Sequence, residues 1–507
     1  MQAVRFFLFA ALLAQASSAS SQAGARTRAP RIWDEMALQS WANPMAGINL
    51  RPHHYSEAEY YAAPVDNLRS YPAYHPDREP AGYLESLRKR GPEPMLELGK
   101  ARTRDEWIEA GRRVWDELDV ARVRTSDFRI IDYLRSREAL KKYPQRMTKD
   151  GRLIDFRWVV ENGGELKLGL TDCSSCHSRV MPDGSVVSGS QANFQPPPFA
   201  PMLNLMFGLF SIPKEPGGEL PAPGEAAYAS FGVPWLSDDV HRRLPSLAPR
   251  DVGALTGAEA SGTFARFNGS SYFTTKIPSL IGVRYSRYLD HTGTHQNRGP
   301  EDIARYAALV STADDGSIGP YKFLTDYQRR LRLRLSDDAL YALGVFIYFG
   351  MQEPPNPNPP GELSRQGEKI FARAGCAGCH TPPAYTNGML IPADGFTPPD
   401  DAETKRLAII RGVRIGSDPG LALKTRKGTG YYKVPSLRGL WHRDLIEHSG
   451  SIASLEDWFD PKRLRPEFVP SGWKGPGVER RAVPGHEFGL DLPAEDKRAL
   501  IAFLRTL

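Results

Sequence analysis

The four cysteines of this 507-residue chain fall into two motifs of the same form, CSSCH from position 173 and CAGCH from position 376. Two residues between the thiols allow one turn of chain to form thioethers to both vinyl groups of a haem, and the His that follows reaches the iron as proximal ligand. Each motif therefore predicts one covalently bound haem c, so two are expected. The predicted attachment and ligand residues are Cys173, Cys176, His177, Cys376, Cys379 and His380.

Two other uses of these cysteines compete with haem attachment. Two Cys-x-x-Cys pairs can build a four-thiolate zinc site, and in an oxidising compartment each pair can close a disulfide. Neither use explains why a His directly follows the second Cys in both motifs. The sequence therefore favours two haems over zinc or disulfides.

Residues 1–19 have the order of a secretory signal peptide. Arg5 precedes an apolar run from Phe6 to Leu13, and small residues follow it. That run is too short to span a bilayer. We predict cleavage of this segment and a mature protein that is periplasmic or secreted. No later stretch reaches about 18 uninterrupted apolar residues, so no membrane span is predicted.

The composition is that of a soluble globular protein. Hydrophobic residues make up 41% of the chain and charged residues 24%, while 43 Pro and 46 Gly predict many loops. The formal net charge of +6 is small for this length. It is not the concentrated basic patch that nucleic-acid binding requires, so no nucleic-acid partner is expected.

An internal duplication follows the two motifs. The segment KIPSLIGVRYSRYLDHTG, from Lys276 to Gly293, aligns without a gap with KVPSLRGLWHRDLIEHSG, from Lys433 to Gly450. The same offset of 157 residues superimposes the block from Leu335 on the block from Leu492. One offset that fits both blocks predicts two homologous halves.

The periodicity of these blocks predicts closing helices. Apolar residues recur at helical spacing after acidic starts, and GEKIFARAGCAGCH supplies a short helix that leads into the second motif. The first half differs at this point, because RWVVENGGELKLGL is typical of a strand hairpin. The apolar positions of the two closing helices are Leu340, Leu343, Phe346 and Ile347, then Leu500, Phe503 and Leu504.

These elements predict a mainly α fold of two tandem cytochrome c-like haem domains, with long loops, little β-structure and an N-terminal extension. Residues 352–362 contain five prolines and form an extended linker. The predicted divisions are a signal peptide at 1–19, an extension at 20–140 with some helix near residues 104–118, a first haem domain at 141–351, the linker, and a second haem domain at 363–507.

This arrangement resembles the bacterial dihaem cytochrome c peroxidase superfamily, which includes MauG and the dihaem rubber oxygenase. Each CxxCH motif is followed by a Pro-Ser-Leu segment and a His-x-Gly turn, and the second half carries the most specific stretch, VPSLRGLWHRDLIEHSGSIASLEDWF. The resemblance covers roughly residues 150–507. It implies that one haem transfers electrons while the other meets peroxide or dioxygen.

The chain departs from that superfamily at the second haem. Peroxidases of the superfamily usually place a Met ligand fourteen residues beyond the His of the second His-x-Gly turn, and here that position is Lys462. A protonated lysine cannot ligate iron. His486 precedes the closing helix in a place similar to the distal His of the rubber oxygenase, which makes it the candidate sixth ligand. The alternative is an ordinary loop histidine.

A second departure concerns the first haem. The peroxidases usually supply a distal His from the loop after the attachment motif, but here the next His downstream is His241. A missing sixth ligand leaves the iron open to peroxide or dioxygen, so the first haem, with proximal His177, is the candidate reactive centre. Weaker substitute ligands are His295, Met181 and Met202.

Other residues near the first haem have two readings each. The apolar stretch from Phe199 to Phe210, with Met202 and Phe207, is either a wall for a hydrophobic substrate or ordinary haem packing. The inter-haem Trp of the superfamily is missing, and Tyr285 and Tyr288 are the candidate redox bridge or simple packing residues. The matched His291 and His448 are expected to share a structural role.

The predicted function is that of a periplasmic dihaem c-type cytochrome oxidoreductase. Peroxide or dioxygen would react at the first haem, and electrons would pass through the second. The resemblance leaves peroxidase and oxygenase types open, although the missing distal ligands favour the oxygenase and MauG branches. The alternatives are a non-catalytic electron-transfer protein and a scaffold. The expected partners are peroxide or dioxygen and either a small redox protein or a hydrophobic substrate.

Overall fold

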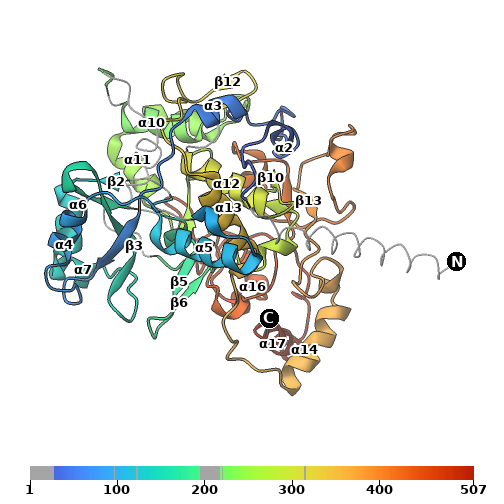
Figure 1. Cartoon of the computed structure of the whole chain (residues 1–507). Helices are drawn as coiled ribbons and strands as arrows, with labels where there is room; N and C mark the ends of the chain where they lie inside the picture. The colour runs from blue at the N-terminus through green and yellow to red at the C-terminus, as the bar shows by residue number, and fades with distance from the viewer. Residues whose placement is uncertain are drawn as a thin grey trace.

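The computed structural model describes residues 28–95, 98–120, 124–170, 172–194, 217–219, 221–312 and 316–507. About 34% of the chain is helical and 13% is strand. The fold is therefore mixed or helical-leaning, with small sheets (Figure 1), which bears out the mainly α prediction in part. Two predicted features lie outside the described residues. They are the predicted signal peptide and the apolar stretch that contains Phe199, Met202 and Phe207. Among the described helices, none has the length and apolar character needed to cross a membrane.

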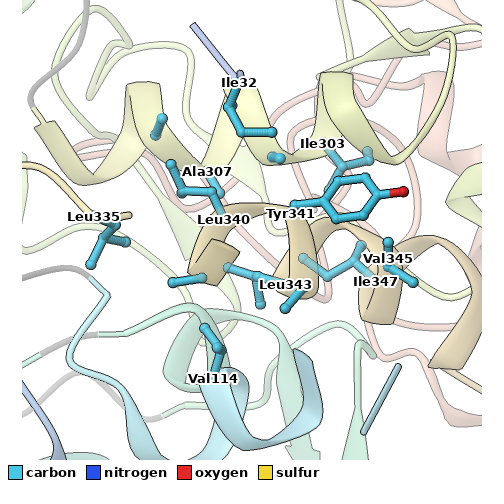
Figure 2. Packing of buried hydrophobic residues seen from close by; sticks show 14 of the residues in the cluster. Ile32, Val114, Ile303, Ala307, Leu335, Leu340, Tyr341, Leu343, Val345 and Ile347 are labelled. Atoms are coloured by element: carbon cyan, nitrogen blue, oxygen red, sulfur yellow. The ribbon is translucent and has the colours of Figure 1, made fainter. Parts of the chain in front are cut away.

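The largest core lies between three helices. Helix α13 (Asp337–Val345) packs between α12 (Pro300–Thr312) and α5 (Arg104–Glu117). All of its residues from 339 to 345 are buried, as expected for a helix covered on both sides. Figure 2 shows its side chains meeting Ile303 of α12 above and Val114 of α5 below. Burial on two faces explains why the apolar pattern of this block extends around the whole helix.

A second pair of helices repeats one of these contacts. Helix α14 (Glu362–Arg373) crosses α17 (Ala494–Leu504), and a Cβ on Gly367 would lie 1.9 Å from the carbonyl oxygen of Ala499. In the first half, a Cβ on Gly111 of α5 would lie 1.9 Å from the carbonyl oxygen of Ala342 in α13. Ala342 and Ala499 are matched residues of the two repeats. Helix α5 therefore takes the place of α14 in the first repeat.

The first repeat contains an insertion that the second lacks. It is a four-stranded antiparallel sheet, ordered β1-β3-β4-β2, of which β1 precedes α5 and the other three strands lie between α5 and the first cysteine motif along the chain. Its strands are β1 (Ser70–Tyr74), β2 (Arg124–Thr125), β3 (Arg152–Val160) and β4 (Leu166–Gly169). The β3–β4 pair confirms the predicted hairpin. The predicted helix near residues 104–118 is also confirmed as α5, although it lies in the segment assigned to the extension; the domain boundaries stay a prediction.

Helices α4, α6 and α7 accompany the sheet at the left of Figure 1. The remaining α-helices of the described residues are short. The helices not yet given are α2 (Glu35–Gln39), α3 (Glu57–Ala62), α4 (Tyr83–Arg90), α6 (Phe128–Arg135), α7 (Arg137–Lys142), α8 (Cys173–Cys176), α10 (Pro223–Phe231), α11 (Pro249–Thr256), α15 (Gly420–Leu423) and α16 (Leu455–Trp458).

Two-stranded antiparallel ladders hold the loops around the cysteine motifs and between the repeats. The ladders are formed by β5 (Ser178–Val180) with β6 (Val186–Ser188), β7 (Thr263–Phe264) with β8 (Thr275–Lys276), β9 (Tyr288–Leu289) with β10 (His295–Gln296), β11 (Ser317–Ile318) with β12 (Tyr321–Lys322), and β13 (Leu390–Pro392) with β14 (Tyr431–Lys433).

Candidate haem sites

The first cysteine motif forms a single helical turn. Asp172 caps α8 by accepting a hydrogen bond of 2.7 Å from the backbone N–H of Cys173. The N–H of His177 donates to the carbonyl of Cys173 over 2.9 Å. These bonds hold both thiols and the imidazole on one turn, the arrangement that haem attachment requires. Cys173 also packs against the core of α5, α12 and α13.

A buried arginine supports this turn. The guanidinium of Arg146 donates to the carbonyls of Ser175 and Ser178 and forms an ion pair with Asp155. It thereby bonds a residue inside the motif and the residue that directly follows the motif. The sequence offers no periodic or motif signal for this role, so sequence reasoning missed it.

The second motif has the same local geometry with a different start. Gly375 adopts a φ of 81°, a left-handed conformation that suits glycine, and a short 3₁₀ turn runs from Cys376 to Gly378. The N–H of His380 donates to the carbonyl of Cys376 over 2.9 Å, as in the first motif. Cys376 packs against the core of α14 and α17.

Both predicted proximal histidines are fixed through Nδ1. The Nδ1 of His177 donates to the carbonyl of Pro278, and the Nδ1 of His380 donates to the carbonyl of Tyr385, each over 3.0 Å. The Tyr385 carbonyl also accepts from the N–H of Leu437, in the second Pro-Ser-Leu segment, over 3.3 Å. Pro278 and Pro435 are matched residues of the two Pro-Ser-Leu segments. Donation from Nδ1 sets the tautomer in which Nε2 binds a metal.

Burial keeps these imidazoles neutral. It lowers the pKa of His177 to about 4 and also lowers the pKa of His380. A neutral imidazole is the form that ligates iron. The thiols of all four cysteines are free, and their pKa values are raised by burial. The residues of both motifs thus fit a covalently attached haem.

The competing zinc site is not formed. Within the described residues, which include all four cysteines, no group of three or more His, Cys, Asp or Glu side chains converges as metal ligands. The two motifs lie instead on separate helical cores. Each motif is therefore an independent site.

His486 lies on the side of the second motif. Burial lowers the pKa of His486 to about 4, and the proximity of Arg463 and of the His380 ring adds to this effect. The ring meets Trp458 edge-on, with 5.2 Å between ring centroids. Its Nδ1 is buried, and among the described residues none is hydrogen-bonded to it. A buried polar atom without a partner is costly, so this ring fits a position beside an iron atom.

A second buried arginine holds the segment that carries His486. Arg463 is fully buried and donates to the carbonyls of Trp458, Val483 and His486, each over 2.8 Å. Its neighbour Lys462, at the position of the superfamily's Met ligand, is exposed. Lysine in solvent at that position agrees with a sixth ligand supplied from elsewhere.

Two histidines downstream of the first motif, His241 and the predicted substitute ligand His295, have other partners. Both ring nitrogens of the buried His241 are bonded, one to Asp239 and one to Ser270, each over 2.7 Å. This histidine is therefore a structural residue. The Nδ1 of His295 bonds Thr294, and its ring lies 4.3 Å from that of Trp41.

Met181 lies in the tight turn between β5 and β6, where its N–H donates to the carbonyl of Ser185. The third substitute, Met202, belongs to the stretch outside the described residues. The hydrogen bonds of His241 thus give no support for it as a ligand of the first haem.

The two tyrosines proposed as a redox bridge differ in position. Tyr288 is buried, and its hydroxyl accepts from the N–H of Ala408 in the second repeat over 2.8 Å. Tyr285 is 38% exposed, and its hydroxyl contacts Arg284. Tyr288 therefore spans the two repeats, while Tyr285 lies at the surface. Neither placement tests electron transfer.

The two repeats contact one another reciprocally. The N–H of Lys276 donates to the carbonyl of His448 over 3.0 Å, and the N–H of Lys433 donates to the carbonyl of His291 over 2.8 Å. All four are matched positions of the duplication. Residue i of one repeat meets j of the other and vice versa, the pattern that a two-fold relation generates. The shared structural role expected of His291 and His448 is confirmed for their backbone.

The side chains of the same lysines repeat this pattern. The Nζ of Lys276 donates to the carbonyl of Leu445 over 3.2 Å, and the Nζ of Lys433 donates to the carbonyl of Tyr288 over 3.0 Å. Burial lowers the pKa of Lys276 to about 7 and that of Lys433 to about 8. The sequence carried a signal for this interface, because a lysine precedes Pro-Ser-Leu by two residues in both repeats.

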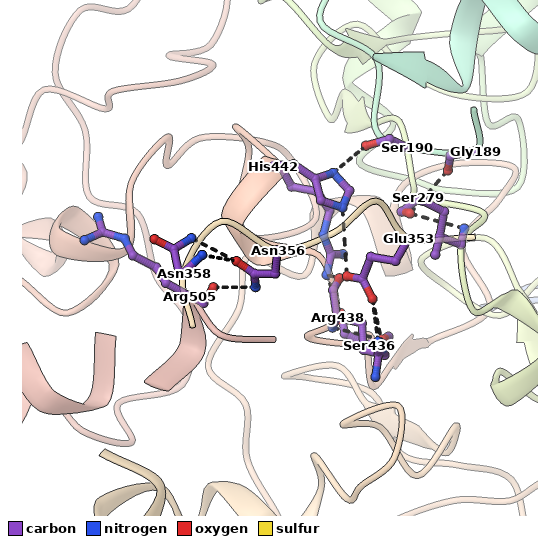
Figure 3. A network of polar contacts seen from close by, with 12 residues as sticks. Gly189, Ser190, Ser279, Glu353, Asn356, Asn358, Ser436, Arg438, His442 and Arg505 are labelled. Carbon is purple, nitrogen blue, oxygen red and sulfur yellow. Dashed lines mark hydrogen bonds and ion pairs between the residues drawn. The ribbon is translucent and has the colours of Figure 1, made fainter. Parts of the chain in front are cut away.

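The predicted linker is attached to both repeats (Figure 3). Glu353 accepts two hydrogen bonds from Arg438, at 2.6 and 2.8 Å. His442 lies next to this pair and exchanges a hydrogen bond of 2.9 Å with Ser190, in the segment after the first motif. One polar network therefore joins three parts of the chain: the start of the linker, the region after the second Pro-Ser-Leu segment and the segment after the first cysteine motif.

One acidic residue makes the repeat interface sensitive to low pH. Burial alone would raise the pKa of Glu447, but His448 and hydrogen bonds from His448 and Ser449 lower it from 4.5 to about 2. A carboxylate with a lowered pKa contributes stability above its unfolded pKa and loses it as the pH falls through its folded pKa.

We therefore expect the free energy of unfolding to decrease as pH is lowered from about 4.5 to about 2. The variant Glu447→Gln should lose much of this acid dependence, whereas Glu456→Gln, at an exposed pair with Arg505, should keep it. Urea unfolding followed by circular dichroism at several pH values measures the difference. Equal acid dependence in Glu447→Gln and the wild type would contradict this prediction.

Comparisons with known proteins come from structure alone. No protein-family profile and no curated protein matches the chain. Similar solved structures include a MauG-like protein associated with microbial copper homeostasis, with 18% identity and a TM-score of 0.27, covering 46% of this chain and 73% of that one. They also include Kuenenia stuttgartiensis hydrazine synthase, with 14% identity and a TM-score of 0.28, covering 60% and 92%. Scores this low do not establish a shared fold.

Proposed function

We propose that the protein is a dihaem c-type cytochrome oxidoreductase that reacts peroxide or dioxygen at the haem of the first motif and passes electrons through the haem of the second. The observation that carries this proposal is the repeated site. There are two CxxCH turns, and in each the Nδ1 of the histidine donates a hydrogen bond to a backbone carbonyl. We further propose export to the periplasm, with residues 1–19 as signal peptide.

The protein residues have separable tasks in this proposal. Haem supplies a redox-active iron at each site. Cys173 and Cys176 hold one group and Cys376 and Cys379 the other, while Pro278 keeps the His177 ring oriented. Such outer hydrogen bonds raise ligand basicity and tune the metal. Tyr288 remains the candidate bridge between the sites.

At the second site, His486 is the proposed sixth ligand, held by the carbonyl contacts of Arg463. At the first site the chain supplies no His in the segment after the motif, which favours an open position. A six-coordinate second haem and an open first haem favour division of labour over a pure electron carrier. Peroxidase and oxygenase activities are both consistent with this proposal.

We expect two covalent haems per chain. Intact mass spectrometry should exceed the polypeptide mass by two haems, and haem staining should persist in denaturing electrophoresis. The single variants Cys176→Ala and Cys379→Ala should each impair attachment at one site and leave the other able to load, because each motif acts alone. A mass equal to the bare polypeptide would contradict the proposed function.

We also expect carbon monoxide to bind the reduced protein, and cyanide the oxidised protein, at the haem of His177. The expected occupancy is one ligand per chain, since His486 would close the second iron. Ligand titration in the wild type and in a variant lacking the second attachment locates the site. Two low-spin haems that bind neither ligand would favour the non-catalytic electron-transfer protein. Binding only at the haem of His380 would reverse the proposed roles.

A further inference from the structure

The carbonyls that orient the proximal histidines are tied to two segments that lie far apart in the sequence. The carbonyl of Pro278 accepts from His177, and the Tyr385 carbonyl that accepts from His380 also accepts from the N–H of Leu437, two residues after Pro435. Each proline follows two residues after a lysine of the repeat interface, Lys276 or Lys433. Any residue that ties these two lysines together therefore connects the surroundings of both proximal histidines.

His291 makes such a connection. Its Nε2 donates to the carbonyl of Lys276 over 2.8 Å, and its own carbonyl accepts from the N–H of Lys433 over 2.8 Å. The result is a continuous route of covalent and hydrogen bonds. It runs from His177 through Pro278 and Lys276 to His291. From there it runs through Lys433 and along the chain to Leu437, whose N–H donates to the Tyr385 carbonyl that accepts from His380.

The matched residue of the second repeat is bonded differently. The Nε2 of His448 is hydrogen-bonded to the hydroxyl of Tyr432 over 3.2 Å, and its Nδ1 pairs with Glu447. Its ring therefore contacts residues of its own repeat, whereas its carbonyl still accepts from Lys276. Two residues in equivalent turns thus differ in one respect, the contact of the ring with the lysine backbone.

We propose that His291 is a positioning residue that couples the two haem sites, by joining the segments that hold the proximal histidines and by carrying the bonded route between them. This inference rests on the proposed function. In the exchange, one electron leaves the centre held by His380, which is oxidised, and reaches the centre held by His177, which is reduced. No bond forms or breaks and no proton moves.

The physical reason lies in the continuity of the route. Electronic coupling falls less steeply through bonds, including hydrogen bonds, than across gaps between atoms. Removing the imidazole of His291 opens a gap between the Lys276 carbonyl and the turn that carries residue 291. It also removes one of the hydrogen-bonded links between the Pro278 and Pro435 segments, so the orientation of both proximal rings becomes less restricted.

The test compares full-length two-haem protein with the variants His291→Ala and His448→Ala. Pulse radiolysis delivers less than one electron per molecule, and absorbance follows its redistribution between the centres. We expect His291→Ala to slow redistribution by about tenfold or more, in the range seen when outer-shell partners of a metal site are removed. His448→Ala should stay closer to the wild-type rate, because the path through its ring is longer: it crosses a hydrogen bond of 3.2 Å and the whole side chain of Tyr432 before it reaches Lys433.

Hydrogen exchange provides a readout that does not depend on haem. In His291→Ala, exchange should increase in peptides covering both residues 276–280 and 433–437, and in His448→Ala mainly in the second. Unchanged redistribution in His291→Ala, or equal slowing in both variants, would overturn the proposal. If the wild type shows no redistribution, the proposed two-centre function fails, and the exchange pattern still decides whether His291 joins the two segments.

Discussion

The variant Gly367→Ala should lower the free energy of unfolding of the α14–α17 unit by about 3 kcal/mol, the upper range for overpacking. A methyl group at this position would lie 1.9 Å from the carbonyl oxygen of Ala499, 2.6 Å from its carbonyl carbon and 2.7 Å from the Cβ of Phe503. The first two obstacles are backbone atoms of α17, which cannot move aside as a flexible side chain can. The helices would have to separate, which would expose the core that Cys376 packs against.

The matched control for this substitution is Gly253→Ala. Gly253 lies inside α11, and a Cβ there would meet nothing within 4 Å. Alanine in an open helical position stabilises by about 0.5–1 kcal/mol, since glycine loses more conformational freedom on folding. Urea unfolding of both variants, followed by far-ultraviolet circular dichroism, measures the two changes. A neutral Gly367→Ala would mean that α14 and α17 do not cross at this distance.

The haem motifs could be found from the sequence because their chemistry is local. Five consecutive residues carry both predicted thioether positions and the predicted proximal ligand, and one turn of chain brings them together. The partner of each histidine could not be found in this way. Pro278 lies about a hundred residues from His177, and its segment stood out only because it is repeated before Pro435.

The helical architecture was predictable where a pattern repeats and not where it is interrupted. The closing helices follow from their apolar periodicity and their matched positions, and the β3–β4 hairpin from its alternation. The sequence predicted α5 as a helix, but strands β2, β3 and β4 lie between it and the first motif along the chain. Its equivalence to α14 becomes visible only through the matched contacts of Gly111 and Gly367.

The two supporting arginines were beyond reach of the sequence for a different reason. Arg146 and Arg463 each collect backbone carbonyls from segments that are distant along the chain. Such a role depends on whether the side chain is buried and on which way it points. The sequence pattern around a single arginine, one of 65 basic residues, indicates neither. Lys462 and Arg463 are neighbours, yet one is exposed and the other fully buried.

The second large effect is expected at His486. In the two-haem protein, His486→Ala should convert the low-spin signal of the second haem to high spin, because no ring remains to close the sixth position. Both haems should stay attached, since Cys376 and Cys379 are unchanged. Electron paramagnetic resonance and absorbance spectra measure the change, and added imidazole should restore the low-spin signal. Carbon monoxide binding should rise from one ligand per chain to two.

Two further variants separate ligation from general damage to the fold. His241→Gln changes another buried histidine, whose nitrogens are bonded to Asp239 and Ser270, so it should reduce stability and leave both haem spectra unchanged. Arg463→Gln keeps the His486 ring but removes carbonyl contacts that hold its segment. A mixture of low- and high-spin second haem is then expected, shifting to high spin on warming as the segment loosens. An unchanged spectrum in His486→Ala would mean that another residue closes the second iron or that none does, and Arg463→Gln would then affect stability alone.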